Sequence, residues 1–209
     1  MRYILCLALM GCAPSLLEEK EDVTTSTDGT NTTTVVDTGT APTDPGLQAG
    51  EYMVDATDYV QWVYYDVTAE EYLVPGEIPD GEKEWVPGPD EVWHMAFRRF
   101  NIKLNGGASG PGDVSALSIE EQDYEALTQA PADGYVTDAE DANEDGVPEY
   151  VFADWYNYDY SSHLLTPKDK VYVIRLSAEE HYKFQHIAYY DDPGTPAMVS
   201  YRMALIDNP

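Results

Sequence analysis

The stretch from Trp93 to Gly112 constrains the fold more than any other part of the sequence. It reads WHMAFRRFNIKLNGGASGPG, with aromatic, basic and apolar residues interleaved up to Leu104 and a run rich in Gly, Ser and Pro after it. Such alternation is typical of a strand, because successive side chains point to opposite faces of a sheet. We therefore expect one long strand over 93–104, followed by a tight turn at Asn105-Gly106-Gly107, where positive φ is tolerated.

Further strands are expected on both sides of this stretch. Aromatic and β-branched residues gather in short runs between 52 and 74, and strand patterns cover 147–155, 170–177, 182–190 and 198–206. Gly194 and Pro196 favour a hairpin between the last two. Ser118 followed by Glu121 forms a capping pattern and predicts one short helix to about Leu127. The sequence thus predicts a mainly β protein, with a single antiparallel sandwich or barrel-like domain and one or two short helices.

Residues 1–49 predict export and anchoring. Residues 1–11 carry one Arg and then an apolar run, as in a secretory signal peptide, and this run is too short to span a bilayer. Leu9-Met10-Gly11-Cys12 resembles the bacterial lipobox, so we expect cleavage before Cys12 and acylation of its thiol; the alternative is a chance Gly-Cys in a leader cut elsewhere. The acylated Cys and a disordered Thr- and Asp-rich linker would occupy 12–49, and the folded β domain 50–209.

The cysteine count and the charge exclude several classes of function. The two cysteines, Cys6 in the leader and Cys12 at the expected acylation site, both precede the β domain, which therefore has no Cys for a disulfide or for a metal site. The formal net charge of −28 argues against nucleic acid and anionic lipid as partners. No GxSxG or HExxH motif is present, and no catalytic constellation stands out, so we expect no enzymatic activity.

One acidic segment resembles the opening of a calcium loop. Oxygen-bearing side chains stand at every second position, at Asp141, Asn143 and Asp145, and Gly146 follows them. Calcium loops begin in this way, because the Gly allows the chain to fold sharply around the ion. Phe152 stands where the bidentate Glu of such a loop is expected, so Glu149 or Asp154 would have to replace it. The alternative is an acidic turn that binds no ion.

The stretch 93–112 also carries a resemblance to a known family. Together with APADGY at 130–135 and the segments DWYNYD and KVYVIRLSAEEHYKFQHIAYYDD, it resembles the HmuY family of bacterial haem-binding lipoproteins. The resemblance covers most of the chain from about residue 50 onward. It implies an antiparallel β fold and a non-catalytic role at the outer membrane or cell surface of a Gram-negative bacterium. There the protein would capture haem or a related tetrapyrrole for iron acquisition and pass it to an outer-membrane transporter.

The same resemblance implies where haem would bind. Haem needs an apolar slot, axial donors such as His, Met or Tyr, and cations for its propionates. In the family, paired side chains hold the iron, and the segment expected to supply one of them, between Tyr135 and Trp155, has no His or Met here. The second is expected after Trp155, where His163 is the candidate axial ligand and Tyr158 or Tyr160 are the alternatives.

Cations for the propionates are the remaining requirement. The candidates are Arg98, Arg99 and Lys103, which would otherwise pair with carboxylates across strands. His181 and His186 lie on one predicted strand at positions that face opposite sides, so they cannot share a ligand. Because one axial ligand is missing, the alternative function is a HmuY-like structural or interaction lipoprotein without haem, with calcium ordering the 141–149 loop.

Overall fold

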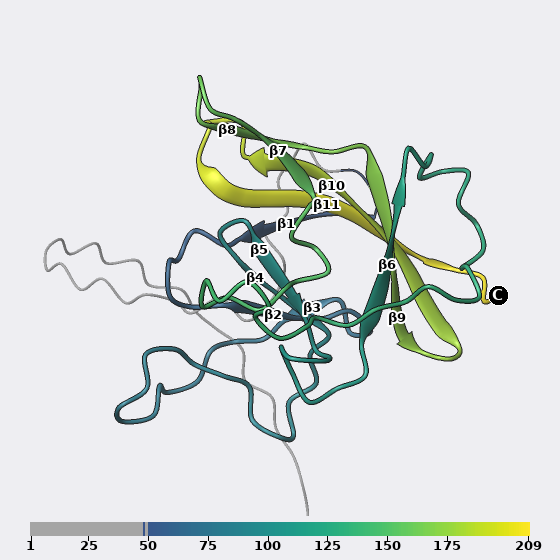
Figure 1. Cartoon of the computed structure of the whole chain (residues 1–209). Coiled ribbons are helices and arrows are strands. Elements are labelled where there is room, and N and C mark those ends of the chain that lie inside the picture. Colours follow the sequence, from purple (N-terminus) through teal and green to yellow (C-terminus); the bar gives the residue numbers. More distant parts are fainter. Residues whose placement is uncertain (1–47, 49) are drawn as a thin grey trace, which may run out of the picture. The chain divides into compact units, whose positions relative to one another are not determined.

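The computed structural model of the protein describes Gln48 and residues 50–209. The predicted signal peptide at 1–11, Cys12 and all of the predicted 12–49 linker except Gln48 lie outside the described residues. Every regular element in the described part of the chain is a strand, so the one or two short helices that we expected are not among them (Figure 1). That part of the chain accordingly offers no helix that could cross a bilayer.

The larger sheet has five antiparallel strands in the order β1-β11-β10-β9-β6. They are β1 (Glu51–Asp55), β6 (Ser115–Glu120), β9 (Lys170–Ser177), β10 (Glu180–Tyr190) and β11 (Pro196–Ile206). The turn between β10 and β11 passes through Gly194, whose φ of 91° lies in the left-handed region that Gly adopts without strain. The three strands predicted near the carboxyl end and their hairpin are confirmed.

A four-stranded sheet and a two-stranded ribbon complete the fold. The four strands are β2 (Val63–Asp66), β3 (Glu71–Tyr72), β4 (Met95–Arg98) and β5 (Asn101–Leu104), in the order β3-β2-β4-β5. The ribbon pairs β7 (Tyr156–Asp159) with β8 (Leu164–Pro167), and β8 contacts β10. In Figure 1 this ribbon, in green, lies beside the yellow-green strand β10.

The two larger sheets share one hydrophobic core. Met95, Phe97, Ile102 and Leu104 of the four-stranded sheet belong to the same buried cluster as Tyr172, Phe184 and Tyr201 of the five-stranded sheet. The Phe97 and Tyr201 rings stack with centroids 5.4 Å apart. Because inward-facing side chains of both sheets meet in one layer, the fold is an antiparallel sandwich-like domain, as predicted.

A second buried cluster covers the other face of the four-stranded sheet. We call it the outer aromatic cluster, and it comprises Trp62, Tyr64, Trp85, Trp93 and Ala96. Adjacent residues Tyr64 and Tyr65 divide between the outer cluster and the main core, as period-two alternation requires. The four-stranded sheet is therefore covered by aromatic side chains on both faces, and three of the four tryptophans of the chain lie in the outer aromatic cluster.

The prediction of one long strand over 93–104 is wrong, because the segment folds back on itself. Arg99, with a φ of 56°, and Phe100 form a turn, and β4 pairs with β5 on either side of it. The turn reverses the expected alternation, so Ile102 lies in the core with Phe97, whereas Lys103 lies opposite Ala96 on the outer face. Gly107 has the positive φ that we predicted, at 62°.

Two further predictions of secondary structure are wrong. The segment expected to be a helix from Ser118 begins inside β6, which pairs along its whole length with β9. The segment 147–155 forms turns instead of a strand, and it uses Phe152 and Trp155 as buried anchors. In both places, contacts with distant strands outweigh the local pattern.

Candidate functional site

An open cavity of about 430 Å³ lies between the β4–β5 turn and the β7–β8 ribbon. We call it the ribbon cavity. Its lining brings together three of the residues singled out in the sequence, His163, Arg98 and Arg99. The complete lining is Tyr59, Arg98, Arg99, Phe100, Asn101, His163, Leu165, Tyr189, Tyr190 and Pro196. Segments distant in sequence thus converge on one aromatic-walled space.

His163 occupies the turn of the ribbon, in a left-handed conformation with a φ of 59°. Its backbone N–H donates to the carbonyl of Asp159 at 2.8 Å, and its ring Nδ1 lies 2.6 Å from the Tyr158 hydroxyl. The Asp159 carboxylate accepts hydrogen bonds from the backbone and hydroxyl of Ser161, and these bonds lower the pKa of Asp159 to about 2. The turn is therefore tightly bonded, and it presents the imidazole on an otherwise exposed segment.

The arginine after β4 is held at the edge of the ribbon cavity. Arg99 donates from Nη1 to the carbonyl of Thr57 at 2.9 Å, and its guanidinium lies 4.3 Å from the Tyr59 ring centroid. A guanidinium has five N–H donors, so this contact leaves others for an anion.

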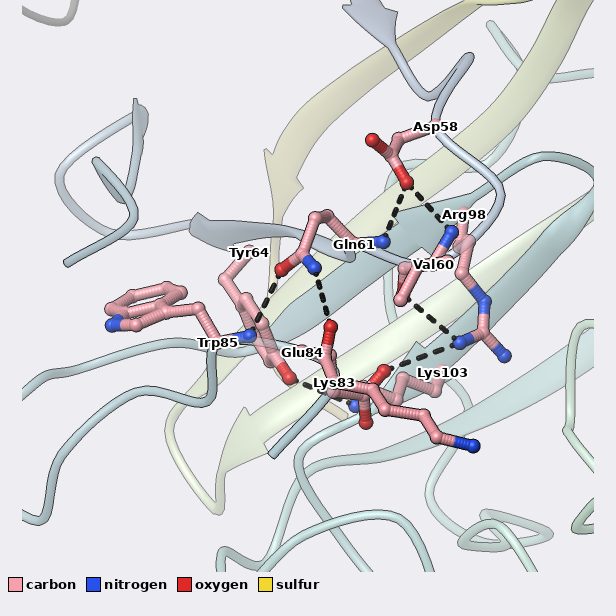
Figure 2. A network of polar contacts seen from close by, with 9 residues as sticks. All are labelled: Asp58, Val60, Gln61, Tyr64, Lys83, Glu84, Trp85, Arg98 and Lys103. Atoms are coloured by element: carbon pink, nitrogen blue, oxygen red, sulfur yellow. Dashed lines mark hydrogen bonds and ion pairs between the residues drawn. The ribbon is translucent and has the colours of Figure 1, made fainter. Parts of the chain in front are cut away.

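The remaining site candidates are engaged by other groups or lie outside the cavity. Arg98 lines the ribbon cavity, but its Nη1 donates to the carbonyl of Val60 and to Glu84. Lys103 lies in the outer aromatic cluster, where its Nζ donates to the Tyr64 hydroxyl at 3.1 Å (Figure 2). Tyr160 is 84 % exposed and does not line the cavity.

Sequence reasoning missed the walls of the cavity. Tyr59, Phe100, Tyr189 and Tyr190 were assigned to strands or left without a role, because nothing local to them marks a binding surface. Phe100 is placed by Trp155, whose indole Nε1 donates to its carbonyl at 2.8 Å. The only local signal of a cavity wall is the pair of tyrosines at the end of β10. Tyrosine side chains on a strand more often pack in the core than line a pocket.

The other two strand histidines face opposite sides of the large sheet, as predicted. His181 meets Tyr135 and the side chain of Asn208. His186 lies in the main core, stacked on Trp155 with ring centroids 4.1 Å apart. Burial lowers the pKa of His186 to about 3, so this imidazole stays neutral inside the protein.

The acidic segment 141–149 forms a turn that uses its own oxygens. The Asp141 carboxylate accepts from the backbone N–H groups of Asp145 and Gly146, the Asn143 side chain also accepts from Asp145, and Asp145 accepts from Val147. Glu149 bridges to Ala139 through its backbone. Within residues 50–209, no group of three or more His, Cys, Asp or Glu side chains is arranged to hold a metal ion. The structure therefore gives no support to a calcium site here.

The sheets and the ribbon cavity define an antiparallel β domain with one aromatic-walled cavity beside the β7–β8 ribbon. The family model described as HmuY protein matches residues 58–203, and the chain therefore belongs to the HmuY family. No curated protein matches the chain.

Solved structures share this fold. The chain is similar to an apo HmuY analogue from Tannerella forsythia, with 19% identity, coverage of 75% of this chain and 94% of that chain, and a TM-score of 0.55. A Bacteroides vulgatus protein classed as HmuY-like and haem-binding has 22% identity, coverage of 77% of this chain and 93% of that chain, and a TM-score of 0.52. A Bacteroides fragilis protein classed as a lipoprotein has 22% identity, coverage of 73% and 88%, and a TM-score of 0.54. At such identities the likeness establishes the fold.

Proposed function

We propose that this protein is a non-catalytic haem-binding lipoprotein that binds haem, or a related tetrapyrrole, in the ribbon cavity. Acylated Cys12 would anchor it to the outer membrane or cell surface, and the 12–49 linker would hold the β domain away from the lipid. The bound haem would pass to an outer-membrane transporter. Membership of the HmuY family and a structural neighbour classed as haem-binding support this role.

One observation carries the proposal: an imidazole, a guanidinium and an aromatic wall line the same cavity. His163 supplies a nitrogen donor for iron, Arg99 supplies a cation for a propionate, and Phe100 and Tyr189 supply flat apolar surface for the macrocycle. The cavity volume of about 430 Å³ falls within the range of roughly 300 to 1,000 Å³ that is typical of small-molecule sites. The cavity is open, so a ligand larger than this volume can extend into solvent.

The contact between Tyr158 and His163 specifies how the ligand would work. A neutral imidazole can bind iron through Nε2 only if Nδ1 carries the proton, so Nδ1–H must donate to the Tyr158 oxygen. That hydrogen bond fixes the ring orientation and raises the basicity of the coordinating nitrogen. Tyr158 is therefore assigned to positioning His163, and exposed Tyr160 is the weaker alternative as a ligand.

A haemin titration followed by Soret absorbance tests the proposal. We expect a saturable, sharpened band with the wild-type protein that weakens or shifts with His163→Ala. Tyr160→Phe tests the alternative ligand of the same turn, and it should leave the band unchanged, because Tyr160 is exposed and lies outside the cavity lining. If His163→Ala leaves saturable haemin binding unchanged, His163 is not the iron ligand.

The second candidate is an interaction lipoprotein that keeps the fold without haem. It is favoured by the cavity lining, in which His163 is the single imidazole and no Met occurs. The family's paired ligation would then have no counterpart within this cavity. No saturable Soret band with either the wild-type protein or His163→Ala would select this candidate.

A further inference from the structure

The ribbon cavity supplies a single imidazole, although haem iron has an axial position on each side of the macrocycle. The lining contains His163 and no other His or Met. Its tyrosines are poor substitutes. The Tyr190 hydroxyl already accepts from the backbone N–H of Leu165 at 3.2 Å, and burial raises the pKa of Tyr189, which disfavours the tyrosinate that would bind iron. The cavity of one chain therefore fits one axial ligand.

The other imidazoles of the chain are held away from this cavity. His181 bonds to Asn208, and His186 is stacked in the main core. The ring Nδ1 of His94 accepts from the backbone N–H of Val67 at 3.1 Å. The methionines of the described residues also lie outside the lining, and they are Met53, Met95, Met198 and Met203. The second ligand is therefore not provided by the described part of the same chain.

The surface around His163 is exposed and rich in large apolar side chains. We call it the cavity rim, and it comprises Tyr59, Phe100, Tyr158, Tyr160 and Leu164. The Tyr158 and Tyr160 rings lie with centroids 5.0 Å apart, and Tyr59 and Phe100 line the cavity together with His163. Strand β7 pairs only with β8, so its other edge is also open. A gathering of exposed apolar groups is typical of a contact surface.

A second copy of the chain matches what this surface lacks. The two axial positions of iron lie on opposite sides of the macrocycle, so the second ligand must approach from the side that the cavity leaves open. A second copy presents the same imidazole and the same rim, and a two-fold axis through the ligand makes the two His163 side chains equivalent. The net charge of −28 on each copy opposes association, so the shared ligand is needed to hold the two copies together.

We propose that two copies of this chain share one haem, with His163 of each copy as an axial ligand. The inference rests on the proposed haem-binding function and names the partner that completes its site. Without haem the protein stays monomeric, because the acidic copies repel each other. Higher ionic strength screens this repulsion and strengthens the haem-linked dimer.

Sedimentation of the full chain during a haemin titration, followed at the Soret band, tests the inference. We expect one haemin per two chains and the mass of two chains. Zinc protoporphyrin, whose metal takes one axial ligand, should bind to single chains without dimerisation. His163→Ala should lose the haemin-dependent dimer.

A charged rim variant and a matched control locate the interface. Leu164→Glu adds a carboxylate beside His163 on a side chain that is 50 % exposed and lies outside the cavity lining. It should weaken the haemin-linked dimer about tenfold or more, because like charges of the two copies meet, and leave zinc protoporphyrin binding unchanged. Leu205→Glu adds the same charge near the end of β11 that lies farther from the cavity-lining Pro196, roughly 30 Å along the strand. This control should dimerise as the wild-type protein does.

The outcomes separate this inference from the haem proposal. One haemin per chain at the mass of a single chain would overturn the shared site and leave the proposed haem-binding function standing. A haemin-dependent dimer that persists in His163→Ala, or equal dimerisation of the Leu164 and Leu205 variants, would also overturn the shared site. The absence of saturable haemin binding would remove both proposals.

Discussion

Replacing His186 by Phe should make the folded protein markedly less sensitive to mild acid. His186 is 6 % exposed, stacks on Trp155, and is surrounded by the rings of Phe152, Tyr172 and Phe184. Its Nε2 has no hydrogen-bond partner in the described part of the chain. Burial lowers its pKa from 6.5 to about 3, because the charged form would lose its hydration without gaining a partner.

The sign and size of the effect follow from proton linkage. Below pH 6.5 the unfolded chain binds a proton at His186, whereas the folded chain does not until about pH 3. The free energy of unfolding therefore falls as the pH falls through this window, by about 1.4 kcal/mol per pH unit. Between pH 7 and pH 5 the loss at this residue is about 2 kcal/mol. Phe keeps an aromatic ring against Trp155 and binds no proton.

Urea denaturation of both proteins at pH 7 and pH 5 measures this difference. We expect the wild-type protein to lose about 2 kcal/mol more of its free energy of unfolding than His186→Phe does between the two pH values. His94, whose pKa is also lowered by burial, is present in both proteins, so its contribution cancels. Equal losses in the two proteins would show that His186 is protonated or solvated in the folded state, and would refute the reasoning.

Two other predictions concern stability. Millimolar calcium should leave the thermal midpoint unchanged, because the oxygens of Asp141 and Asp145 already bond to the turn; a rise in the midpoint would mean that an ion binds the native state. Asp138→Ala should lower the free energy of unfolding by about 2 to 5 kcal/mol in urea denaturation, since it leaves the backbone N–H groups of Leu104 and Val151 without an acceptor. Asp138→Asn, which keeps one acceptor oxygen, should cost less, and equal stability of the alanine variant and the wild type would contradict this account.

The strands with strong local patterns could be predicted from the sequence. Residues 170–206 alternate clearly and have a Gly-containing turn, so three strands and their antiparallel pairing followed from local rules. The turn at Arg99 and Phe100 could not be predicted in this way, because neither residue is typical of a turn. Ser118 and Glu121 mimic a helix start, but residues 118–120 belong to β6 and pair with β9, so the chain is already extended where the helix was expected to begin.

The candidate site was predictable only in part. His163 and Arg99 were selected through the family resemblance, and the structure places both in the lining of the ribbon cavity. Tyr59 and Tyr189 reach the same cavity from distant segments, and no local pattern shows such long-range convergence. Lys103 was selected with the two arginines as a cation for propionates, but it lies on the outer face of the four-stranded sheet, where it bonds to the Tyr64 hydroxyl and does not line the ribbon cavity.

The central claim is that haem iron is bound by His163 in the ribbon cavity. Chemical rescue tests it most directly: haemin spectra of the ferric and ferrous complexes are recorded for the wild-type protein and for His163→Gly, with and without added imidazole. We predict that the glycine variant loses the wild-type Soret band and that imidazole restores it, because the free base occupies the vacated ligand position. A wild-type spectrum from His163→Gly in the absence of imidazole would contradict the claim.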